Sequence, residues 1–399
     1  MVLAVCAITV FGGYLLKAQC LDPWDGRQYG RGCYNDIQAL YGGRGIATNT
    51  FPYVHGRLVD QQLLDGAIEY PVLTGVFMWA SGLPVEDENS YLRLSAVLLA
   101  PVAIVIAYLL FGLSGRRALM WAAAPAIVLY SFHNWDLLVV LAAVAGVWAW
   151  ARDRPVWAAL CFGIGGALKM YPLFFLAPLL LDRWQRGDRA GGLRALGIGI
   201  GAWAAINLPF ALINFDGWWA TYEFHRLRGA DWNSIWIWWT PTWSPEQLNL
   251  VTAGLTAGFF AAILSIGWIR ARRAGGFPFV QVCAALLATF LIFNKVHSPQ
   301  YALWILPFFA LVRVHFLWWV AYSLIDLLVY VSIFRWFYDF GYRNIEVGMW
   351  KRWLIAGVWG RAVLLLVLAG LFLVARDTVR NRMARQNVSH DGATVGSQV

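Results

Sequence analysis

The amino-acid sequence predicts an all-α, polytopic membrane protein. Of its 399 residues, 60% are hydrophobic and 13% are charged, whereas soluble domains are roughly half apolar and a quarter charged. Apolar runs recur along nearly the whole chain, and arginine clusters stand at every second junction between them. This composition excludes a disordered chain and a small disulfide-rich scaffold.

About ten to twelve membrane spans are expected, because a span needs a predominantly apolar run of about 20 residues. Several runs are shorter than this, so we expect tilted, kinked and broken helices. The first run has neither a basic leader nor a small-residue cleavage site, which predicts a retained span. The runs lie at 1–16, 91–112, 118–132, 135–151, 155–168, 172–182, 195–213, 249–269, 277–293, 300–312, 314–334 and 353–375.

The arginine clusters predict the orientation of the chain in a plasma membrane. Under the positive-inside rule they are cytoplasmic, which places both termini inside. Because the net charge of +9 follows these junctions, it marks topology and not a nucleic-acid surface. The clusters are Arg116/Arg117, Arg152/Arg154, Arg183/Arg186/Arg189/Arg194, Arg270/Arg272/Arg273, Arg313 and Arg376/Arg380/Arg382/Arg385.

Three segments outside the spans follow from this topology. Residues 17–90 form a long first extracytoplasmic loop, within which the short apolar run 69–83 is expected as a re-entrant or interfacial helix. Residues 214–247 form a second large extracytoplasmic loop. The polar tail 376–399 is expected to be cytoplasmic and disordered.

Polar residues that could take part in catalysis or binding gather on the outer side. The first outer loop contains Asp36 in CYNDIQALY and ends in Glu69-Tyr70-Pro71. Further outer segments are His133-Asn134-Trp135-Asp136, Lys169-Met170-Tyr171-Pro172, the loop string EFHRLRGADWNSIWIWW, and Asn294 to Tyr301. One face therefore carries carboxylates, cations and aromatic rings beside lipid-facing helices.

These motifs, in this order, resemble glycosyltransferase family 87 of the GT-C class. The shared features are an acidic residue in the first outer loop, a Tyr-Pro boundary, a Lys-x-Tyr-Pro turn and a late His-x-x-Gln-Tyr. The resemblance implies a GT-C-like catalytic domain over residues 1–375 that needs no cofactor. Because the similarity is to actinobacterial mannosyltransferases, it also implies inverting transfer of mannose from a polyprenyl-phosphate donor to an envelope glycolipid or polysaccharide. The family's Tyr-Pro-Pro is Tyr70-Pro71-Val72 here, and related enzymes use arabinofuranose donors, so both sugars stay open.

Asp36 is the expected catalytic base, in the position of the family's base. A carboxylate that is partly desolvated at the membrane surface has a raised pKa, which suits this role. The alternative is that Asn35-Asp36 caps the short helix that begins here. The nearby DPWDG string indicates a turn whose acids are solvated.

Cations on the outer side are expected to receive the charge of the departing phosphate. The alternative is that they contact lipid headgroups. The chain lacks Asp-x-Asp and similar paired motifs, so no metal is expected. The expected phosphate ligands are Lys169, Arg226, Arg228, Lys295 and His297.

Other polar and aromatic residues are expected to contact the sugar or the acceptor. For Glu69 and Asp136, pairing with Lys169 is an equal alternative; for the aromatic residues, the alternative is an interfacial belt. The residues are Glu69, Tyr70, Asn134, Asp136, Tyr171, Gln300 and Tyr301. Cys20 and Cys33 share the outer loop and would form a disulfide in an oxidising compartment.

A transporter is the main competing class, followed by a non-catalytic scaffold. Transporters place ionisable residues near the bilayer midplane and show related halves. In this sequence only Asp326 and Arg361 lie well inside spans, and no internal repeat is visible. We therefore favour the enzyme.

Overall fold

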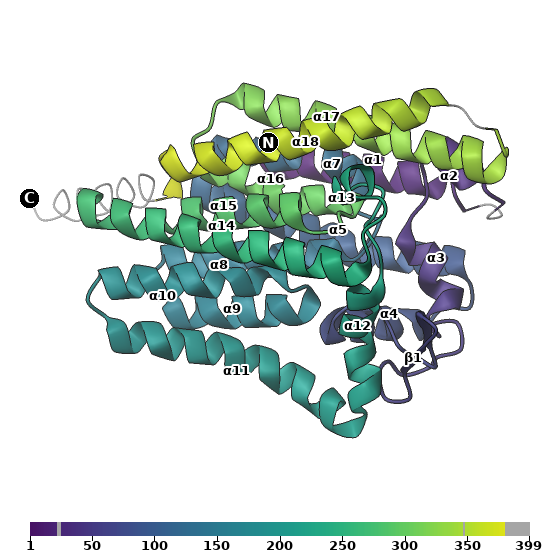
Figure 1. Cartoon of the computed structure of the whole chain (residues 1–399), viewed down its shortest axis with the longest axis horizontal. Coiled ribbons are helices and arrows are strands. Elements are labelled where there is room, and N and C mark those ends of the chain that lie inside the picture. The colour runs from purple at the N-terminus through teal and green to yellow at the C-terminus, as the bar shows by residue number, and fades with distance from the viewer. Residues whose placement is uncertain (22–24, 346–347, 380–399) are drawn as a thin grey trace, which may run out of the picture.

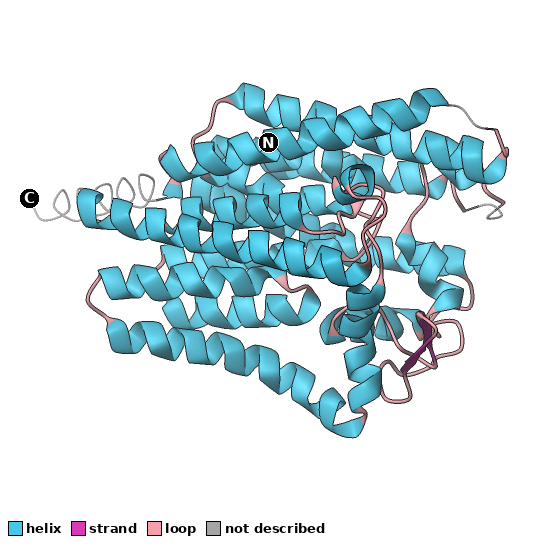
Figure 2. Cartoon of the chain, viewed as in Figure 1, coloured by secondary structure: helices cyan, strands magenta, loops and turns pink. Residues whose placement is uncertain are grey.

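The computed structural model describes residues 1–21, 25–345 and 348–379, and it is a bundle of helices (Figures 1 and 2). The strands of the described part form one antiparallel ribbon, β1 (Arg57–Val59) and β2 (Gln62–Leu64). Among the described residues, five helical stretches have the length and apolar composition to cross a membrane. The predicted all-α, multi-pass architecture is therefore confirmed. The short β-ribbon was not predicted from the sequence.

The long apolar helices supply most of the bundle. They are α5 (Glu88–Ser114), which continues into the next turns, α11 (Arg189–Ile213), α14 (Pro245–Ala274), α17 (Phe316–Phe337) and α18 (Gly348–Val374). The shorter apolar helices that complete it are α1 (Val2–Ala18), α8 (Asp136–Ala151), α9 (Pro155–Leu168), α15 (Phe279–Phe293) and α16 (Ala302–Leu311).

Three expected spans are broken helices. The run 118–132 divides into α6 (Leu119–Ala122) and α7 (Pro125–Tyr130), because Pro125 lacks the N–H that would continue the first helix. The other two begin as 3-10 turns, η2 (Tyr171–Phe175) before α10 (Leu176–Gln185) and η3 (Pro299–Tyr301) before α16. The breaks at η2 and η3 put irregular backbone beside the cavity described below.

The two expected outer loops build a cap at one end of the bundle. The first contains α2 (Arg27–Arg31), α3 (Asp36–Gly43), the ribbon and α4 (Val72–Gly82). Because α4 has 11 residues, its length is about 16 Å, too short to cross a bilayer core of about 30 Å. The second contains α12 (Phe215–Leu227) and α13 (Trp236–Trp239), and α12 runs across the direction of the long helices (Figure 1).

The loops that carry the arginine clusters meet at the other end. The Arg117 guanidinium donates to the Val312 carbonyl at 2.9 Å, and Arg183 pairs with Asp153 at 2.8 Å. The Gln185 amide donates to the Ala271 carbonyl at 3.3 Å. The clusters and the cap therefore lie at opposite ends of the helices.

The expected disorder of the tail is wrong for its first four residues. The backbone N–H of Thr378 donates to the Leu311 carbonyl at 2.9 Å, and the Gln281 amide donates to the Asp377 carboxylate at 3.3 Å. The first bond satisfies a carbonyl at the end of α16 and the second joins the segment to α15, so residues 376–379 belong to the packed structure. The remainder of the predicted tail, 380–399, lies outside the described residues.

Candidate active site

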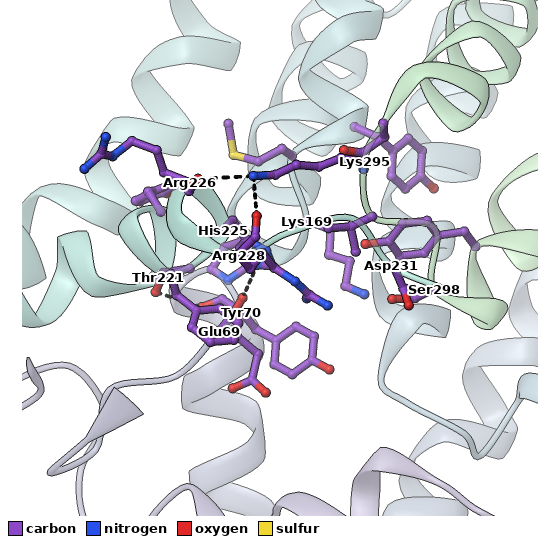
Figure 3. Close-up of a pocket in the computed structure, with 18 of the residues that line it drawn as sticks. Glu69, Tyr70, Lys169, Thr221, His225, Arg226, Arg228, Asp231, Lys295 and Ser298 are labelled. Atoms are coloured by element: carbon purple, nitrogen blue, oxygen red, sulfur yellow. Dashed lines mark hydrogen bonds between the residues drawn. The ribbon is translucent and has the colours of Figure 1, made fainter. Parts of the chain in front are cut away.

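A cavity of about 750 Å³ opens at the capped end of the bundle (Figure 3). The start of α3, the boundary before α4, α12, α14 and the turns at 169–171 and 294–301 surround it. Nine of the predicted site residues line it, namely Asp36, Glu69, Tyr70, Lys169, Tyr171, Arg226, Arg228, Lys295 and Tyr301. Segments far apart in the sequence thus contribute to one polar space.

The Asp36 carboxylate is not used to cap α3, because the neighbouring residue caps this helix. The Asn35 side chain accepts the Gln38 N–H at 2.8 Å, which makes Asn35 the N-cap of α3. The capping alternative therefore holds for Asn35 and is wrong for Asp36. Two side chains hold the Asp36 carboxylate instead: Asn134 donates to Oδ2 at 2.8 Å, and the Tyr70 hydroxyl at 3.4 Å.

The environment of Asp36 makes it a stronger base than an ordinary aspartate. Burial raises the pKa of the carboxyl, the negative charge of Glu69 adds to the rise, and the bond from Asn134 opposes it. The direction agrees with what general-base chemistry near neutral pH requires.

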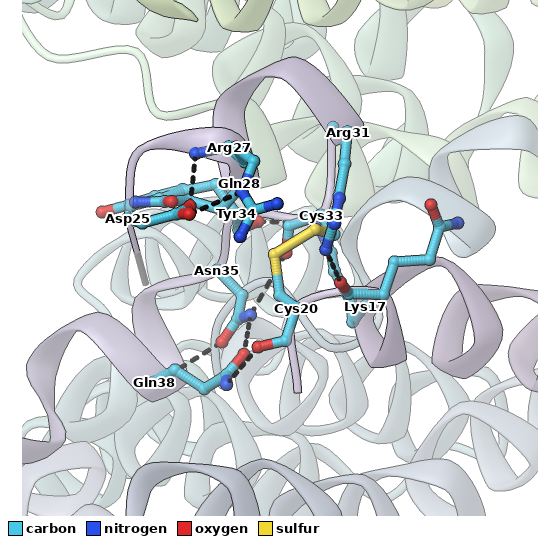
Figure 4. The surroundings of a disulfide bond; sticks show 12 residues. Lys17, Cys20, Asp25, Arg27, Gln28, Arg31, Cys33, Tyr34, Asn35 and Gln38 are labelled. Carbon is cyan, nitrogen blue, oxygen red and sulfur yellow. Dashed lines mark hydrogen bonds and ion pairs between the residues drawn. A yellow bond between two sulfur atoms is a disulfide. The ribbon is translucent and has the colours of Figure 1, made fainter. Parts of the chain in front are cut away.

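A disulfide joins Cys20 to Cys33 beside Asn35 and Gln38 at the start of α3 (Figure 4). The Gln38 side chain donates to the Cys20 carbonyl at 2.9 Å, and the Asn35 amide donates to the Cys33 carbonyl at 3.2 Å. The covalent bond and the two amides together fix the start of α3, which carries Asp36.

Lys169, which lines the cavity, forms a buried ion pair with Asp136. The Lys169 Nζ lies 2.8 Å from Asp136 Oδ1, and the aspartate side chain is fully buried. The Trp304 indole N–H donates to the same oxygen at 3.0 Å. Of the two acids considered for Lys169, the structure thus selects Asp136, whereas Glu69 pairs with Arg44 at 2.5 Å.

Close backbone packing creates the turn that carries Lys169. A Cβ on Gly166 would lie 2.4 Å from the Leu173 side chain, so a larger residue would force Leu173 or the turn to shift. The Thr74 hydroxyl of α4 donates to the Leu168 carbonyl at 2.7 Å. The Lys-x-Tyr-Pro turn is thereby fixed against the Tyr-Pro boundary.

Aromatic rings form one wall of the cavity. Trp304 stacks on Tyr171 with ring centroids 4.5 Å apart, and on Tyr301 with centroids 3.8 Å apart. The Lys169 Nζ lies 5.1 Å from the ring centroids of both Tyr70 and Tyr301. This wall is flat and partly polar, as carbohydrate faces require, and it also stabilises the lysine charge.

The remaining cavity cations differ in how they are paired. Arg226 is exposed and forms an ion pair with Glu223. The Lys295 Nζ donates to the carbonyls of Arg226 and Arg228, and burial lowers its pKa to about 8. Arg228 forms no ion pair or side-chain hydrogen bond within the described part of the chain.

The orientation of Arg228 is visible in Figure 3, where its side chain extends toward Lys169. The Arg226 side chain extends away from that group. The Arg228 guanidinium lies 5.7 Å from the centroid of the Phe224 ring, which leaves its N–H groups available to a ligand. Arg228 is therefore the cation best placed to bind an anion in this cavity.

Four predicted site residues do not line the cavity. Asn134 and Asp136 act through Asp36 and Lys169, and Gln300 is buried. His297 is also buried, and its Nδ1 lies 2.9 Å from the Leu291 carbonyl. Burial and the nearby charge of Arg361 hold its pKa well below the usual value, so the imidazole is neutral and supplies no charge for a phosphate.

The structure adds three cavity or near-cavity groups that the sequence analysis did not select. Arg44 neutralises Glu69. The His225 Nε2 lies 2.9 Å from the Glu69 carbonyl, and burial lowers its pKa to about 4. Asp231 lines the cavity, and burial raises its pKa. His225 and Asp231 stand in the loop string already noted, but no spacing rule distinguishes them there.

Comparison with known families identifies the family of the chain. The model of glycosyltransferase family 87 matches residues 70–293, which is more than half of the chain. Of the nine predicted residues that line the cavity, Asp36, Glu69, Lys295 and Tyr301 lie outside the matched range. No curated protein matches the chain. The match confirms the resemblance seen in the sequence: the chain belongs to glycosyltransferase family 87 and is a multi-pass membrane glycosyltransferase.

Proposed function

We propose that this enzyme transfers a sugar, most simply mannose, from a polyprenyl-phosphate donor to a hydroxyl of an envelope glycolipid or polysaccharide, with inversion at the anomeric carbon. One observation carries the proposal. A single cavity contains a carboxylate of raised pKa, Asp36, and an arginine, Arg228, that forms no salt bridge within the described part of the chain. A base and an anion-binding group are the two functions that this transfer needs.

In the proposed reaction Asp36 accepts the proton of the acceptor hydroxyl. The acceptor oxygen forms a bond to the anomeric carbon from the face opposite the phosphate. The bond between that carbon and the phosphate oxygen breaks, and its electron pair leaves with polyprenyl phosphate. The sugar–acceptor product, polyprenyl phosphate and protonated Asp36 balance the step, and the proton then passes to water.

The departing phosphate gains negative charge, which Arg228 receives with the help of Lys295. Arginine can donate two parallel hydrogen bonds to a phosphate. Lys295 holds the backbone on both sides of Leu227 through two carbonyls, so its ammonium is fixed beside the Arg228 segment. Lys169 contributes less net charge because Asp136 neutralises it, and its proposed task is to orient the aromatic wall and the sugar.

We place this reaction on the extracytoplasmic side of the plasma membrane, with both termini in the cytoplasm. Two observations support the placement. The disulfide at the capped end suits an oxidising compartment. The arginine-bearing loops lie at the opposite end, where the positive-inside rule expects the cytoplasm.

The test is donor consumption by the purified protein in lipid nanodiscs. Polyprenyl-phosphate-mannose and polyprenyl-phosphate-arabinofuranose are supplied in parallel, with an actinobacterial membrane lipid extract as the source of acceptor. We expect mannose transfer, release of polyprenyl phosphate, and a product whose anomeric configuration, read by NMR, is opposite to that of the donor. Consumption of the arabinofuranose donor alone would replace mannose in the proposal, and retention of configuration would refute the mechanism.

A further inference from the structure

A buried ion pair between two long helices lies outside the lining of the cavity in which the reaction is proposed. Asp326 stands near the middle of α17 and Arg361 near the middle of α18, and both side chains are 2% exposed. Charged groups inside a membrane bundle are costly and tend to be retained for function. The pair therefore needs an explanation beyond the contact between two helices.

The strongest bond of Arg361 does not go to the acid. Its Nη1 lies 3.7 Å from Asp326 Oδ1, which is beyond hydrogen-bond distance. Its Nη2 donates to the backbone carbonyl of Asn233 at 2.7 Å. Asp326 thus balances the charge, while the guanidinium is directed at the loop between α12 and α13.

A small cavity of about 10 Å³ lies between Arg361, Asn233 and His297. Each of these residues has one buried polar atom without a hydrogen-bond partner in the described part of the protein: Arg361 Nη1, Asn233 Oδ1 and His297 Nε2. The volume is close to the lower limit for one water molecule, which needs two to four polar partners.

The donors and acceptors around this cavity match one water. Because His297 Nδ1 faces the Leu291 carbonyl, its proton lies on Nδ1, and Nε2 is an acceptor. Asn233 Oδ1 is also an acceptor, and Arg361 Nη1 is a donor. A water molecule donates twice and accepts once here, so it would satisfy all three atoms together.

The segment that Arg361 holds carries two cavity residues. From Arg228 and Asp231 the chain passes inward, and Asn233, Ser234 and Trp236 are each at most 3% exposed. Lys295 fixes the outer part of this segment, with its Nζ on the Arg228 carbonyl at 2.7 Å and its own carbonyl accepting the Asp231 N–H at 2.9 Å. Arg361 fixes the inner part.

We propose that Arg361, charge-balanced by Asp326, is a positioning residue that anchors the 228–236 segment through the Asn233 carbonyl and a buried water, and so fixes Arg228 at the mouth of the donor site. The anchoring stands on its own geometry. Its kinetic consequence rests on the proposed function, through the role given there to Arg228.

The test removes both charges at once, because a lone buried charge would destabilise the protein. The variant Arg361→Met/Asp326→Leu is expected to fold with near-normal thermal stability, since apolar replacement of a buried pair is tolerated. Hydrogen–deuterium exchange of peptides covering 228–236 should rise by roughly 10- to 100-fold, the effect of losing a hydrogen bond to a charged group. Asn233→Leu keeps the pair and the carbonyl, and should raise exchange by a smaller factor.

The matched control is Arg186→Met/Asp182→Leu, which likewise removes both charges of an ion pair, at the opposite end of the bundle. Its 228–236 exchange should equal that of the wild type. Unchanged exchange in the folded double variant would overturn the proposal, whatever its activity.

A kinetic cycle separates this proposal from the proposed function. If the anchor acts through Arg228, Arg228→Ala should weaken binding of polyprenyl phosphate strongly in the wild type, and by less than roughly 3-fold in the double variant. Equal losses in both backgrounds would overturn the link between the anchor and Arg228. Faster exchange with no effect of Arg228→Ala in either background would support the anchor and refute the phosphate role of Arg228.

Discussion

The sharpest prediction from this structure concerns Asp36→Asn. Asparagine has the size of aspartate, and its side-chain oxygen can still accept the bond that Asn134 donates at 2.8 Å. The cap of α3 is unaffected, because Asn35 supplies it. The proton acceptor is lost, so turnover should fall by about 100- to 10,000-fold, the usual contribution of general-base catalysis. This range corresponds to about 2.7–5.4 kcal/mol in the activation free energy.

The same substitution should not reduce stability. The pKa of Asp36 is raised in the folded state, so the ionised carboxylate lowers the free energy of unfolding as pH rises through the interval between its unfolded and folded pKa values. Above the folded-state pKa that penalty is fully present in the wild type, and it is absent from the asparagine variant. We therefore expect a thermal unfolding temperature equal to or above that of the wild type.

Asn35→Ala is the matched control. It removes an N-cap, which costs about 0.5–2 kcal/mol of stability, and leaves Asp36 in place. The measurement is sugar transfer by both detergent-purified variants, normalised to monodisperse protein, with unfolding temperatures recorded in parallel. The turnover of the wild type should fall on acidification, and the midpoint of this fall should lie above about pH 4, the ordinary aspartate pKa. Substantial activity of folded Asp36→Asn would refute the reasoning, and Asp231 would then be the next base to test.

Lys169→Ala should lower the free energy of unfolding by about 3–5 kcal/mol, because it leaves the buried Asp136 carboxylate unpaired. The double variant Lys169→Met/Asp136→Leu should recover most of this loss. Thermal unfolding that shows no such recovery would contradict the assignment of the pair. Arg228→Ala should reduce turnover by roughly 10- to 1000-fold with an unchanged unfolding temperature. The control Arg226→Ala breaks an exposed pair with Glu223 and should change turnover by less than about 3-fold. Equal effects of the two substitutions on turnover would leave Arg228 without a special role. The orientation can be tested in intact cells with a protein that lacks free cysteines. A membrane-impermeant thiol reagent should label the variant Glu88→Cys and not Arg273→Cys, both exposed positions. The reverse pattern would place the cavity on the cytoplasmic side.

Local features of the sequence were sufficient to predict the class of protein and most of the residues that line the cavity. Hydrophobic runs and arginine clusters are local features, and a membrane converts them directly into spans and junctions. Nine of the thirteen predicted catalytic and binding residues line one cavity for the same reason, because residues at the same ends of neighbouring spans come to the same side. The Lys-x-Tyr-Pro turn is marked locally by Pro172 and by small residues that permit close packing.

The tertiary structure alone decided which of these residues pair. Asp136 and Glu69 are equivalent in sequence as partners for Lys169, but the helices pack so that Asp136 meets the lysine and Arg44 meets Glu69. The direction in which His297 points, inward to Arg361 and away from the cavity, depends on α18, which lies more than 50 residues further along the chain. Pairing of this kind is fixed by contacts between distant segments, and no local pattern of hydrophobicity or charge encodes them.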